Sequence, residues 1–299
     1  MKLRELGEDR LLEQLLPALS IRKDVLVGAG DDCAVVRLPS KNRLLLLKVD
    51  CVVEEIHFAS SADPAAVGWK AMMRPLSDFA AMSGLPQFAL ITLIVPAARS
   101  ASWVKSLYRG LRRAAGRFGV SIVGGETSDT NGPVAISVSV AGFVERARIV
   151  SRRGGKGGDD IFVTGKLGGS PRGKHLRFFP RIDEARWLTK NFPVHAMIDL
   201  SDGLGADLPR LAKASQLSFK IDMERLPLNP GCRVNNAIAD GEDYELLFAI
   251  APRHSQRLQK TWRQKFPKLP LTCIGQLDQI SKIKHQTSLR GYVHFKQSR

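Results

Sequence analysis

Segments with the apolar pattern of strands alternate with segments of helical period along almost the whole chain. In the first half, strand-like runs at 44–49, 121–123 and 134–144 flank two helical patterns, one beginning near Pro64 and one at 101–118. The last of these runs, VAISVSVAGFV, alternates as a half-buried strand does. This order predicts an α/β or α+β fold and excludes the all-helical and all-β classes.

The second half continues this order behind a basic, glycine-rich connector. The connector, RARIVSRRGGKGG at 146–158, interrupts periodic structure with glycines and charges. It therefore predicts a division into two domains, 1–145 and 146–299. Beyond it, the pattern predicts strands at 160–164, 196–200, 244–250 and 271–275, and helices at 206–214 and 254–265.

The helix of the first half is predicted to begin at Pro64, since Asp63 can cap it and proline suits the first helical position. Pro75 lacks the amide hydrogen and crowds the preceding turn, so it is predicted to end or kink this helix. Asp78 would then follow a break in the helix.

Composition is that of an ordinary globular protein. With 299 residues, 44% of them hydrophobic and 25% charged, the chain can bury two modest cores. It has no apolar run of the ~18 to 20 residues that a membrane span needs, and its amino terminus is charged and amphipathic. A soluble, cytoplasmic enzyme with no membrane partner is expected. The four cysteines lie far apart without a CxxC pair, which favours buried thiols over zinc ligands.

The net charge of +16 is compatible with nucleic acid, anionic metabolites or a solubilising surface. The basic residues of the carboxy-terminal region are scattered singly among apolar and polar residues, and no RNA- or DNA-binding signature accompanies them. A solvated basic face is favoured, and no nucleic-acid partner is predicted.

The few acids of this basic chain lie at strand ends or in glycine-bounded turns. A carboxylate after an apolar strand lies at the strand's carboxyl end, where open α/β sheets place their ligand crevices. Asp50, Glu126 and Asp199 fit that description. The full set is Asp31 and Asp32 in GAGDDC, Asp50 in LLLLKVD, Asp78 in PLSD, Glu126 in VGGET, Asp199 and Asp202 in IDLSDG, and Glu242 and Asp243 in DGEDYELLF.

Carboxylates that converge on one crevice repel one another and need cations to stay ionised. Hard oxygen ligands suit Mg²⁺, which carboxylates share with substrate phosphates. A nucleotide site with several Mg²⁺ ions is the resulting hypothesis. Taken singly, each motif also fits a structural role: GAGDD as a turn or cap, IDLSDG as a helix start, and DGEDYELLF as a turn that enters a buried strand. The chain has no Walker loop, no protein-kinase motif set and no GxGxxG fingerprint, so ATP would need another architecture.

Read in order, these motifs resemble those of thiamine-monophosphate kinase, a family related to the aminoimidazole ribonucleotide and selenophosphate synthetases. The resemblance covers nearly the whole chain, and its segments VDCVVEEIHF and GEDYELLF separate this kinase from its relatives. The other matching segments are GAGDDCAVV, WKAMMRPLSDFAAMSGLPQFALITLIVP, IVGGETS, SRRGGKGGDDIFVTG, IDLSDGLGADL, and TCIGQL with a closing GY.

The resemblance implies a two-domain, aminoimidazole ribonucleotide synthetase-like fold. In this fold a mixed amino-terminal sheet forms a barrel with the sheet of a second copy, and a carboxy-terminal α/β domain follows. A homodimer would bind ATP between its domains and use several Mg²⁺ ions. It would transfer the γ-phosphoryl group of ATP directly to thiamine monophosphate, giving thiamine diphosphate and ADP. Such a transfer needs alignment and charge neutralisation more than a covalent nucleophile, so no catalytic nucleophile is expected.

Matched by motif, the resemblance also implies the site residues. The acids expected to bind Mg²⁺ are Asp32, Asp50, Asp78, Glu126, Asp199 and Asp202. The residues expected beside ATP are Gly125, Glu126, Arg152 and Ser201. Arg152 would contact the phosphates, because a guanidinium matches phosphate oxygens in pairs. The residues expected to hold thiamine phosphate are His57, Glu242 and Tyr292. Taken alone, His57 also fits a structural histidine and Tyr292 a core or edge-strand tyrosine.

The chain departs from the family pattern within these motifs. Lys48 and Val49 stand where a Ser-Thr pair usually precedes Asp50, which removes two hydroxyls that could bind metal. The Lys48 ammonium could partly substitute for a cation or could point into solvent. Glu126 replaces an aspartate and is one methylene longer, which matters to Mg²⁺ because its octahedral geometry is strict.

Pro75 replaces a usual asparagine, and Asp240 replaces a glycine. The segment 165–198 is shorter than usual, and GKLGGSPRGKHLRFFPRIDEARWL stands in place of the usual helix. Two alternatives to an active kinase therefore stay open. One is a related ATP-using synthetase or phosphotransferase with another small substrate. The other is a catalytically weakened paralogue that binds nucleotide.

Overall fold

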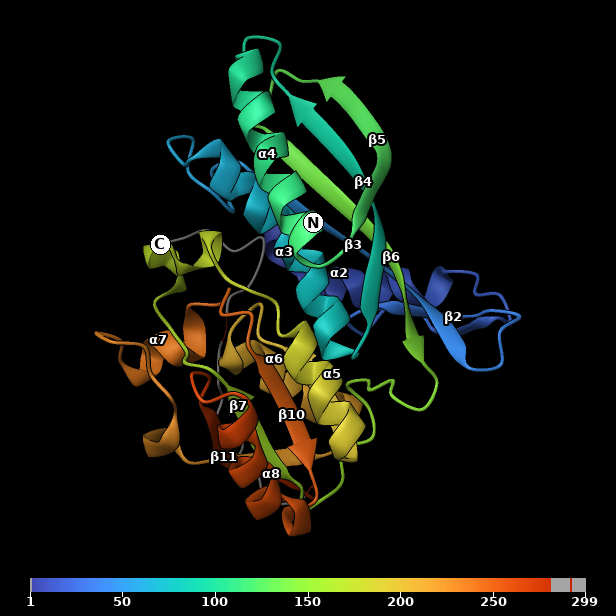
Figure 1. The fold of residues 1–299 in the computed structure, drawn as a ribbon, viewed down its shortest axis with the longest axis vertical. Helices are drawn as coiled ribbons and strands as arrows, with labels where there is room; N and C mark the ends of the chain where they lie inside the picture. The colour runs from blue at the N-terminus through green and yellow to red at the C-terminus, as the bar shows by residue number, and fades with distance from the viewer. Residues whose placement is uncertain (1, 281–290, 292–299) are drawn as a thin grey trace.

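The computed structural model describes residues 2–280 and Gly291, and it contains two mixed α/β parts (Figure 1). A six-stranded sheet with its helices belongs to the first half of the chain, and a five-stranded sheet with its helices belongs to the second. The prediction of a mixed α/β fold is confirmed. The short helical elements are α1 (Leu3–Leu6), α2 (Glu8–Leu15), η1 (Leu16–Ala18), η2 (Ser170–Arg172), η3 (Lys174–Leu176) and η4 (Met223–Arg225).

The first sheet has the strand order β1-β2-β3-β6-β4-β5 and is antiparallel except between β4 and β5. Because side chains alternate across a strand, one face of this sheet can be apolar and covered. Helix α3 (Pro64–Ala81) packs on that face, with α4 (Ala101–Arg117) against α3 (Figure 1). The strands are β1 (Val25–Val27), β2 (Ala34–Arg37), β3 (Arg43–Val53), β4 (Leu85–Val95), β5 (Ser121–Asp129) and β6 (Ala135–Glu145).

The second sheet has the strand order β8-β10-β7-β11-β9 and is antiparallel throughout. Both of its faces are covered, which explains why every residue of β10 is buried and why its sequence LLFAI does not alternate. Phe248 packs in the same core as Trp262 of α8, while Leu247 packs with Leu208 of α6 on the other side. The elements are β7 (Asp160–Thr164), α5 (Ile182–Asn191), β8 (Val194–Asp199), α6 (Leu204–Ala214), β9 (Ser218–Ile221), α7 (Val234–Ala239), β10 (Leu246–Ile250), α8 (Pro252–Lys265) and β11 (Leu271–Asp278).

Helix α3 joins the two halves. It packs on the first sheet with one side and touches α5 and β8 of the second half with another. The Trp69 indole donates a hydrogen bond to the Phe178 carbonyl at 2.9 Å, and the Ser77 hydroxyl donates to Asp199 at 2.6 Å. Most of α3 is consequently buried, and residues on it lie close to both sheets.

The prediction that Pro75 ends or kinks its helix is wrong. Helix α3 runs from Pro64 to Ala81, with Pro75 inside it and Asp78 in its last turn. A proline inside a helix costs about 3 kcal/mol, but burial of nearly all the surrounding side chains offsets that cost. The predicted start is confirmed, because the Asp63 carboxylate accepts hydrogen bonds from the amides of Ala65 and Ala66.

The prediction that Asp50 and Glu126 end their strands is also wrong. β3 continues to Val53, because it pairs with β6 along its full length. β5 continues to Asp129, and Gly125 lets it approach β4, since a Cβ there would lie 1.8 Å from the Ile91 carbonyl oxygen. Polar residues interrupt the apolar pattern of these strands, so the sequence predicted shorter strands than the structure has. Asp199 does end β8, as predicted.

A helix also forms where the sequence predicted none. α5 lies within the segment 165–198, with Ile182, Ala185 and Leu188 buried at helical spacing and Asp183 in its first turn. The predicted boundary between 145 and 146 falls between β6 and β7 and stays a prediction. Of the helices described, none is both long and apolar enough to cross a membrane.

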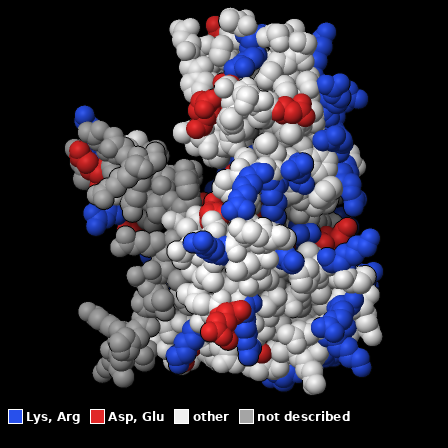
Figure 2. Space-filling model, turned by 90° about the vertical axis from the view of Figure 1, so that its left-hand side faces the viewer, with Lys and Arg blue, Asp and Glu red and all other residues white. Residues whose placement is uncertain are grey.

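Lys and Arg side chains are spread over the molecular face shown in Figure 2, with acidic side chains between them. On that face they extend over both the upper and the lower parts of the molecule and do not form a single continuous patch. This distribution fits a solvated basic surface. The absence of a nucleic-acid partner stays a prediction.

Candidate active site

Three aspartates from distant parts of the chain meet between the two sheets. Asp32 lies in the turn before β2, Asp78 in the last turn of α3 and Asp199 at the end of β8. One carboxylate oxygen of each lies within 4.8 Å of those of the others, and all three residues are buried. We call Asp32, Asp78 and Asp199 the acidic cluster. They are three of the six acids assigned to Mg²⁺ from the sequence, and that role stays a prediction.

The carboxylates of the acidic cluster disfavour one another's ionisation. Burial, followed by the charge of Asp32, raises the pKa of Asp199 to about 7. Burial also raises the pKa of Asp78 well above its usual value, although Lys48 opposes that shift. A divalent cation would relieve this repulsion, and carboxylate oxygens are the ligands that Mg²⁺ prefers. The donor set of the acidic cluster therefore fits Mg²⁺.

Lys48 lies against the acidic cluster. Its Nζ is 2.7 Å from Oδ1 of Asp78 and 3.9 Å from Oδ1 of Asp50, and its side chain is 22% exposed. This contact excludes the alternative in which Lys48 points into solvent. Asp50 lies in the interior of β3. The same ammonium group stands beside both Asp50 and Asp78 of the acidic cluster.

Arg152 supplies a second protein cation at the acidic cluster. Its Nη2 donates to Oδ1 of Asp32 at 2.8 Å, and its backbone amide donates to the Asp31 carboxylate at 3.3 Å. Burial and the neighbouring charge of Asp32 raise the pKa of Asp31 to about 6. Arg152 belongs to the connector between the sheets, so this segment places a guanidinium beside Asp31 and Asp32.

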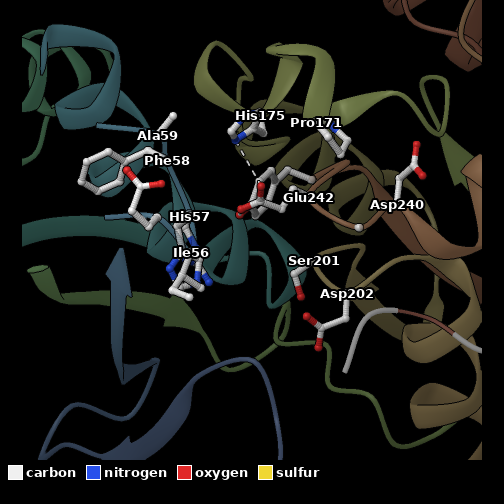
Figure 3. Close-up of a pocket in the computed structure, with 14 residues that line it drawn as sticks. Ile56, His57, Phe58, Ala59, Pro171, His175, Ser201, Asp202, Asp240 and Glu242 are labelled. Atoms are coloured by element: carbon white, nitrogen blue, oxygen red, sulfur yellow. Dashed lines mark hydrogen bonds and ion pairs between the residues drawn. The ribbon is translucent and has the colours of Figure 1, made fainter. Parts of the chain in front are cut away.

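A cavity of about 380 Å³ opens near the carboxyl end of β8 and the loop after β3 (Figure 3). It gathers four of the residues predicted to bind ATP, metal or substrate, namely His57, Ser201, Asp202 and Glu242. The other lining residues are Glu55, Ile56, Phe58, Ala59, Arg74, Pro171, His175, Asp240, Gly241 and Tyr244.

Glu242 is held at the cavity wall by two basic side chains. Its Oε1 lies 2.6 Å from Nζ of Lys70. Its Oε2 lies 3.1 Å from Nδ1 of His175, the contact drawn in Figure 3. Burial alone would raise the pKa of Glu242, but the hydrogen bond to His175 and the charge of Lys70 hold it at about 2. This carboxylate is therefore ionised at neutral pH.

Lys70 is fully buried, and its ammonium is nevertheless fully engaged. It donates to the His57 carbonyl oxygen at 2.5 Å and lies 2.7 Å from Nδ1 of His175, in addition to its contact with Glu242. Burial lowers the pKa of Lys70 to about 8, although the charge of Glu242 opposes the shift. The group ties α3 to the loop after β3 and to η3.

His57 serves both the loop and the cavity. Its Nδ1 accepts a hydrogen bond from the Val53 amide at 3.0 Å, which shapes the turn after β3, and its side chain lines the cavity. The structural interpretation of this histidine and a binding role are thus compatible.

Ser201 and Asp202 follow β8 and line the cavity on the side of the second sheet. Their backbone amides donate to Asp207 at 3.0 and 2.9 Å, which fixes the turn IDLSDG. Asp202 pairs with Arg210 of α6 and does not belong to the acidic cluster. Its assignment to Mg²⁺ stays a prediction.

Gly125 and Glu126 lie on β5, an edge strand of the first sheet. Among the described contacts, Glu126 accepts a hydrogen bond from the Ser128 hydroxyl at 3.4 Å, and it is not part of the acidic cluster. The predicted substrate residue Tyr292 lies outside the described residues. The roles of these three residues stay predictions.

The sequence analysis did not identify several side chains that define this region. Ser77 donates to Asp199, Lys70 and His175 hold Glu242, and Arg74 lines the cavity. Lysine and arginine within the otherwise apolar helix at 64–81 were the available signal, because charged residues are rarely buried without a partner. No comparable signal marked His175.

Both parts of the chain match family descriptions of known proteins. Residues 30–144 match "AIR synthase related protein, N-terminal domain", and residues 140–263 match "AIR synthase related protein, C-terminal domain". The predicted aminoimidazole ribonucleotide synthetase-like fold is therefore confirmed for these residues, while the barrel with a second copy stays a prediction.

Similar proteins cover most of the chain. It is 36% identical over 271 residues to a thiamine-monophosphate kinase of Rhodopirellula baltica, covering 85% of this chain and 84% of that protein. It is 30% identical to a thiamine-monophosphate kinase of Haemophilus influenzae, covering 98% of this chain and 99% of that protein. A solved structure described as AaThiL complexed with AMPPCP and TMP superposes with a TM-score of 0.80 at 34% identity, covering 93% of each chain.

Proposed function

Since this chain belongs to the thiamine-monophosphate kinase family of AIR synthase related proteins, we propose that it phosphorylates thiamine monophosphate. The γ-phosphoryl group of ATP is transferred to the phosphate of the acceptor, giving thiamine diphosphate and ADP. The acidic cluster, three buried carboxylates that need cations, is the observation that carries the proposal. The likeness to AaThiL complexed with AMPPCP and TMP supports it.

The proposed cofactor is Mg²⁺ held by Asp32, Asp78 and Asp199, with Asp50, Glu126 and Asp202 as the further ligands expected from their motifs. When bound, it neutralises phosphate charge during transfer. The chain's own residues hold these carboxylates in place. Ser77 fixes one oxygen of Asp199, and Lys48 fixes one of Asp78.

The proposed ATP site comprises Gly125, Glu126, Arg152 and Ser201. Arg152 supports this assignment because its guanidinium already contacts a carboxylate of the acidic cluster, where phosphates would also lie. Ser201 follows β8 directly after Asp199 and Leu200, at the edge of the sheet nearest the acidic cluster.

The proposed acceptor site is the cavity lined by His57 and Glu242, with Tyr292 expected from its motif. Thiamine carries a positively charged thiazolium ring, and an ionised Glu242 with aromatic Tyr244 and Phe58 provides suitable surroundings. Direct transfer places no covalent step on the protein. The Cys33 thiol beside the acidic cluster is buried, and that burial raises its pKa, which suits packing better than nucleophilic attack.

We also propose a homodimer formed through the uncovered face of the first sheet. Large apolar side chains on neighbouring strands are exposed there, including Leu47, Val49, Phe88, Leu90 and Val123. A contiguous apolar surface of this kind marks an interaction face. The matching face of a second copy would cover it. Light scattering on the purified protein should give twice the chain mass of 32.9 kDa.

Conversion of thiamine monophosphate in a single turnover tests the function. Enzyme in excess, ATP and Mg²⁺ should yield thiamine diphosphate and ADP in equal amounts, and omission of Mg²⁺ should abolish product. Phosphorylation of a different small acceptor would indicate a related phosphotransferase instead.

The contact of Lys48 with Asp78 favours one second candidate, a paralogue that binds nucleotide with weakened turnover. Tight binding of a non-hydrolysable ATP analogue, together with no product from any acceptor, would support that alternative.

A further inference from the structure

Among the described residues, Arg74 of the cavity wall has a buried donor without a hydrogen-bond partner. It lies on α3 one helical turn before Asp78, so both side chains lie on the same side of the helix. Its Nη1 donates to the Cys51 carbonyl oxygen of β3 at 2.9 Å. Its Nε, in contrast, is buried and has no hydrogen-bond partner among the described residues.

A buried N–H without an acceptor is costly. Leaving such a group unpaired costs about 1–3 kcal/mol, and more where the group is charged. Within the described part of the chain, Nε of Arg74 is the only buried side-chain nitrogen or oxygen in this condition. Native structures rarely keep such a group unless something else supplies the acceptor.

The surroundings of Arg74 keep it charged. Burial would lower its pKa, but the oxygens of Tyr244, Asp50 and Glu242 outweigh that effect and raise it. Arg74 therefore presents a full positive charge at the boundary between the cavity and the acidic cluster.

The acids whose charges act on Arg74 also face other cations. Glu242 is paired with Lys70 and His175, Asp78 is paired with Lys48, and Asp50 lies 3.9 Å from the same lysine. The edge of the guanidinium that carries Nε also carries Nη2, and two parallel N–H groups on one edge match two oxygens of a phosphate. A phosphate at this place would have the acidic cluster on one side and the cavity on the other.

We propose that Arg74 binds the phosphate group of the acceptor through its Nε edge and thereby selects phosphorylated over unphosphorylated thiamine. The proposal rests on the proposed function, since it concerns the acceptor of that reaction. Arg74 acts as a specificity-determining residue: it holds the oxygens of the phosphate that receives the γ-phosphoryl group. The organic part of the acceptor lies in the remainder of the cavity.

Calorimetric titration of two ligands tests this role. Thiamine monophosphate and thiamine are titrated separately into the wild type, Arg74→Met and Arg74→Lys, each with Mg²⁺ and a non-hydrolysable ATP analogue. Arg74→Met should weaken binding of thiamine monophosphate by about 10- to 100-fold, as expected for a charged hydrogen bond, and should leave the affinity for thiamine within about twofold. Arg74→Lys keeps the charge without the paired donors and should lie in between.

The controls separate this role from a structural one. Arg112→Met, at an exposed site on α4, should bind both ligands as the wild type does. Equal weakening of both ligands by Arg74→Met, or unchanged binding of thiamine monophosphate, would overturn the proposal. If Arg74→Met does not fold, the same comparison is made with Arg74→Lys alone.

The two proposals fail in different ways. A wild type that converts thiamine monophosphate while Arg74→Met binds it equally well would refute only the role of Arg74. A wild type that neither binds nor converts thiamine monophosphate would refute the proposed function and this role with it.

Discussion

Two carboxylates that contact α3 have opposite protonation behaviour: Asp199 through Ser77 and Glu242 through Lys70. In the acidic cluster, burial and the neighbouring charge of Asp32 raise the pKa of Asp199 to about 7. At the cavity wall, the pKa of Glu242 is held at about 2, because the hydrogen bond to His175 and the charge of Lys70 outweigh its burial. Burial acts to raise the pKa of both carboxylates, although the Glu242 side chain is still 24% exposed, so their partners make most of the difference.

This difference assigns separate tasks to the two regions. Glu242 already faces the Lys70 ammonium within the protein. Lys48 and Arg152 contact the acidic cluster, but mutual repulsion among its three acids remains, which a metal ion would relieve. The proposed function accordingly assigns metal and phosphate to the acidic cluster and the organic acceptor to the cavity.

Asp199→Asn gives the largest expected effect. Removing a carboxylate from the acidic cluster should lower kcat by roughly 10³-fold, the equivalent of several kcal/mol of transition-state stabilisation. Rapid-quench measurement of product formation checks this value. Asp183→Asn, at an exposed acid in the first turn of α5, is the matched control and should retain full activity. Retained activity in Asp199→Asn would contradict the assignment of metal and phosphate to the acidic cluster.

Glu242→Gln should mainly affect stability and acceptor binding. It removes the charge that faces the buried Lys70 ammonium, and we expect a loss of about 2 kcal/mol of unfolding free energy. The loss stays below that of fully buried pairs, because Lys70 can release its proton. Urea denaturation measures the change. The double variant with Lys70→Met should recover part of the loss, and additive losses would show that the pair is not coupled.

Lys48→Met should increase the difference between the two regions, because it removes the ammonium that is paired with Asp78. In the proposed metal site the ammonium would compete with a metal ion for Asp78, so its removal should lower the Mg²⁺ concentration needed for half-maximal binding. About fivefold is expected, the equivalent of the ~1 kcal/mol between unit charges about 4 Å apart in water. Titration with Mn²⁺ followed by electron paramagnetic resonance checks this. Lys105→Met, at an exposed position of α4, should show no shift, and a higher Mg²⁺ requirement in Lys48→Met would contradict the competition.

The smallest effect is expected at a third, more exposed carboxylate. Glu145 pairs with both terminal nitrogens of Arg186 at 2.6 and 2.7 Å, and this hydrogen bonding lowers its pKa to about 2. Because the folded pKa lies below the ordinary value of 4.5, the pair stabilises the fold above about pH 4.5 and loses this contribution as the pH falls toward 2. Glu145→Gln should therefore lower the melting temperature slightly at pH 7. At pH 2 the variant and the wild type should melt alike, and an equal difference at both values would refute the linkage.

The acids of the acidic cluster were predictable from sequence, whereas their neighbours were not. Asp32 and Asp199 stand in short motifs next to strands, and Ser201 and Asp202, which follow β8, line the cavity. Lys70 and Arg74 lie in an apolar helix, where the sequence does not show whether a basic side chain finds an acid on a distant loop. Their partners, such as Glu242, are far away along the chain and meet them only through tertiary packing.

For the fold, too, local features were predictable from the sequence and the effects of long-range packing were not. Strand and helix types were read from periodicity, and the structure agrees with them. Local rules failed where long-range packing outweighs them: Pro75 remains helical because α3 is buried on several sides, and β3 runs past Asp50 because β6 pairs with it throughout. These are cases in which tertiary contacts override local propensity.

Binding measurements on two variants test the division of tasks most directly. Asp199→Asn and Glu242→Gln are each titrated with Mn²⁺ in the presence of a non-hydrolysable ATP analogue, and separately with thiamine monophosphate. We expect Asp199→Asn to lose metal binding while retaining the acceptor, and Glu242→Gln to lose acceptor affinity while retaining the metal. Equal loss of both ligands in both folded variants would contradict the assignment of metal to the acidic cluster and of the acceptor to the cavity.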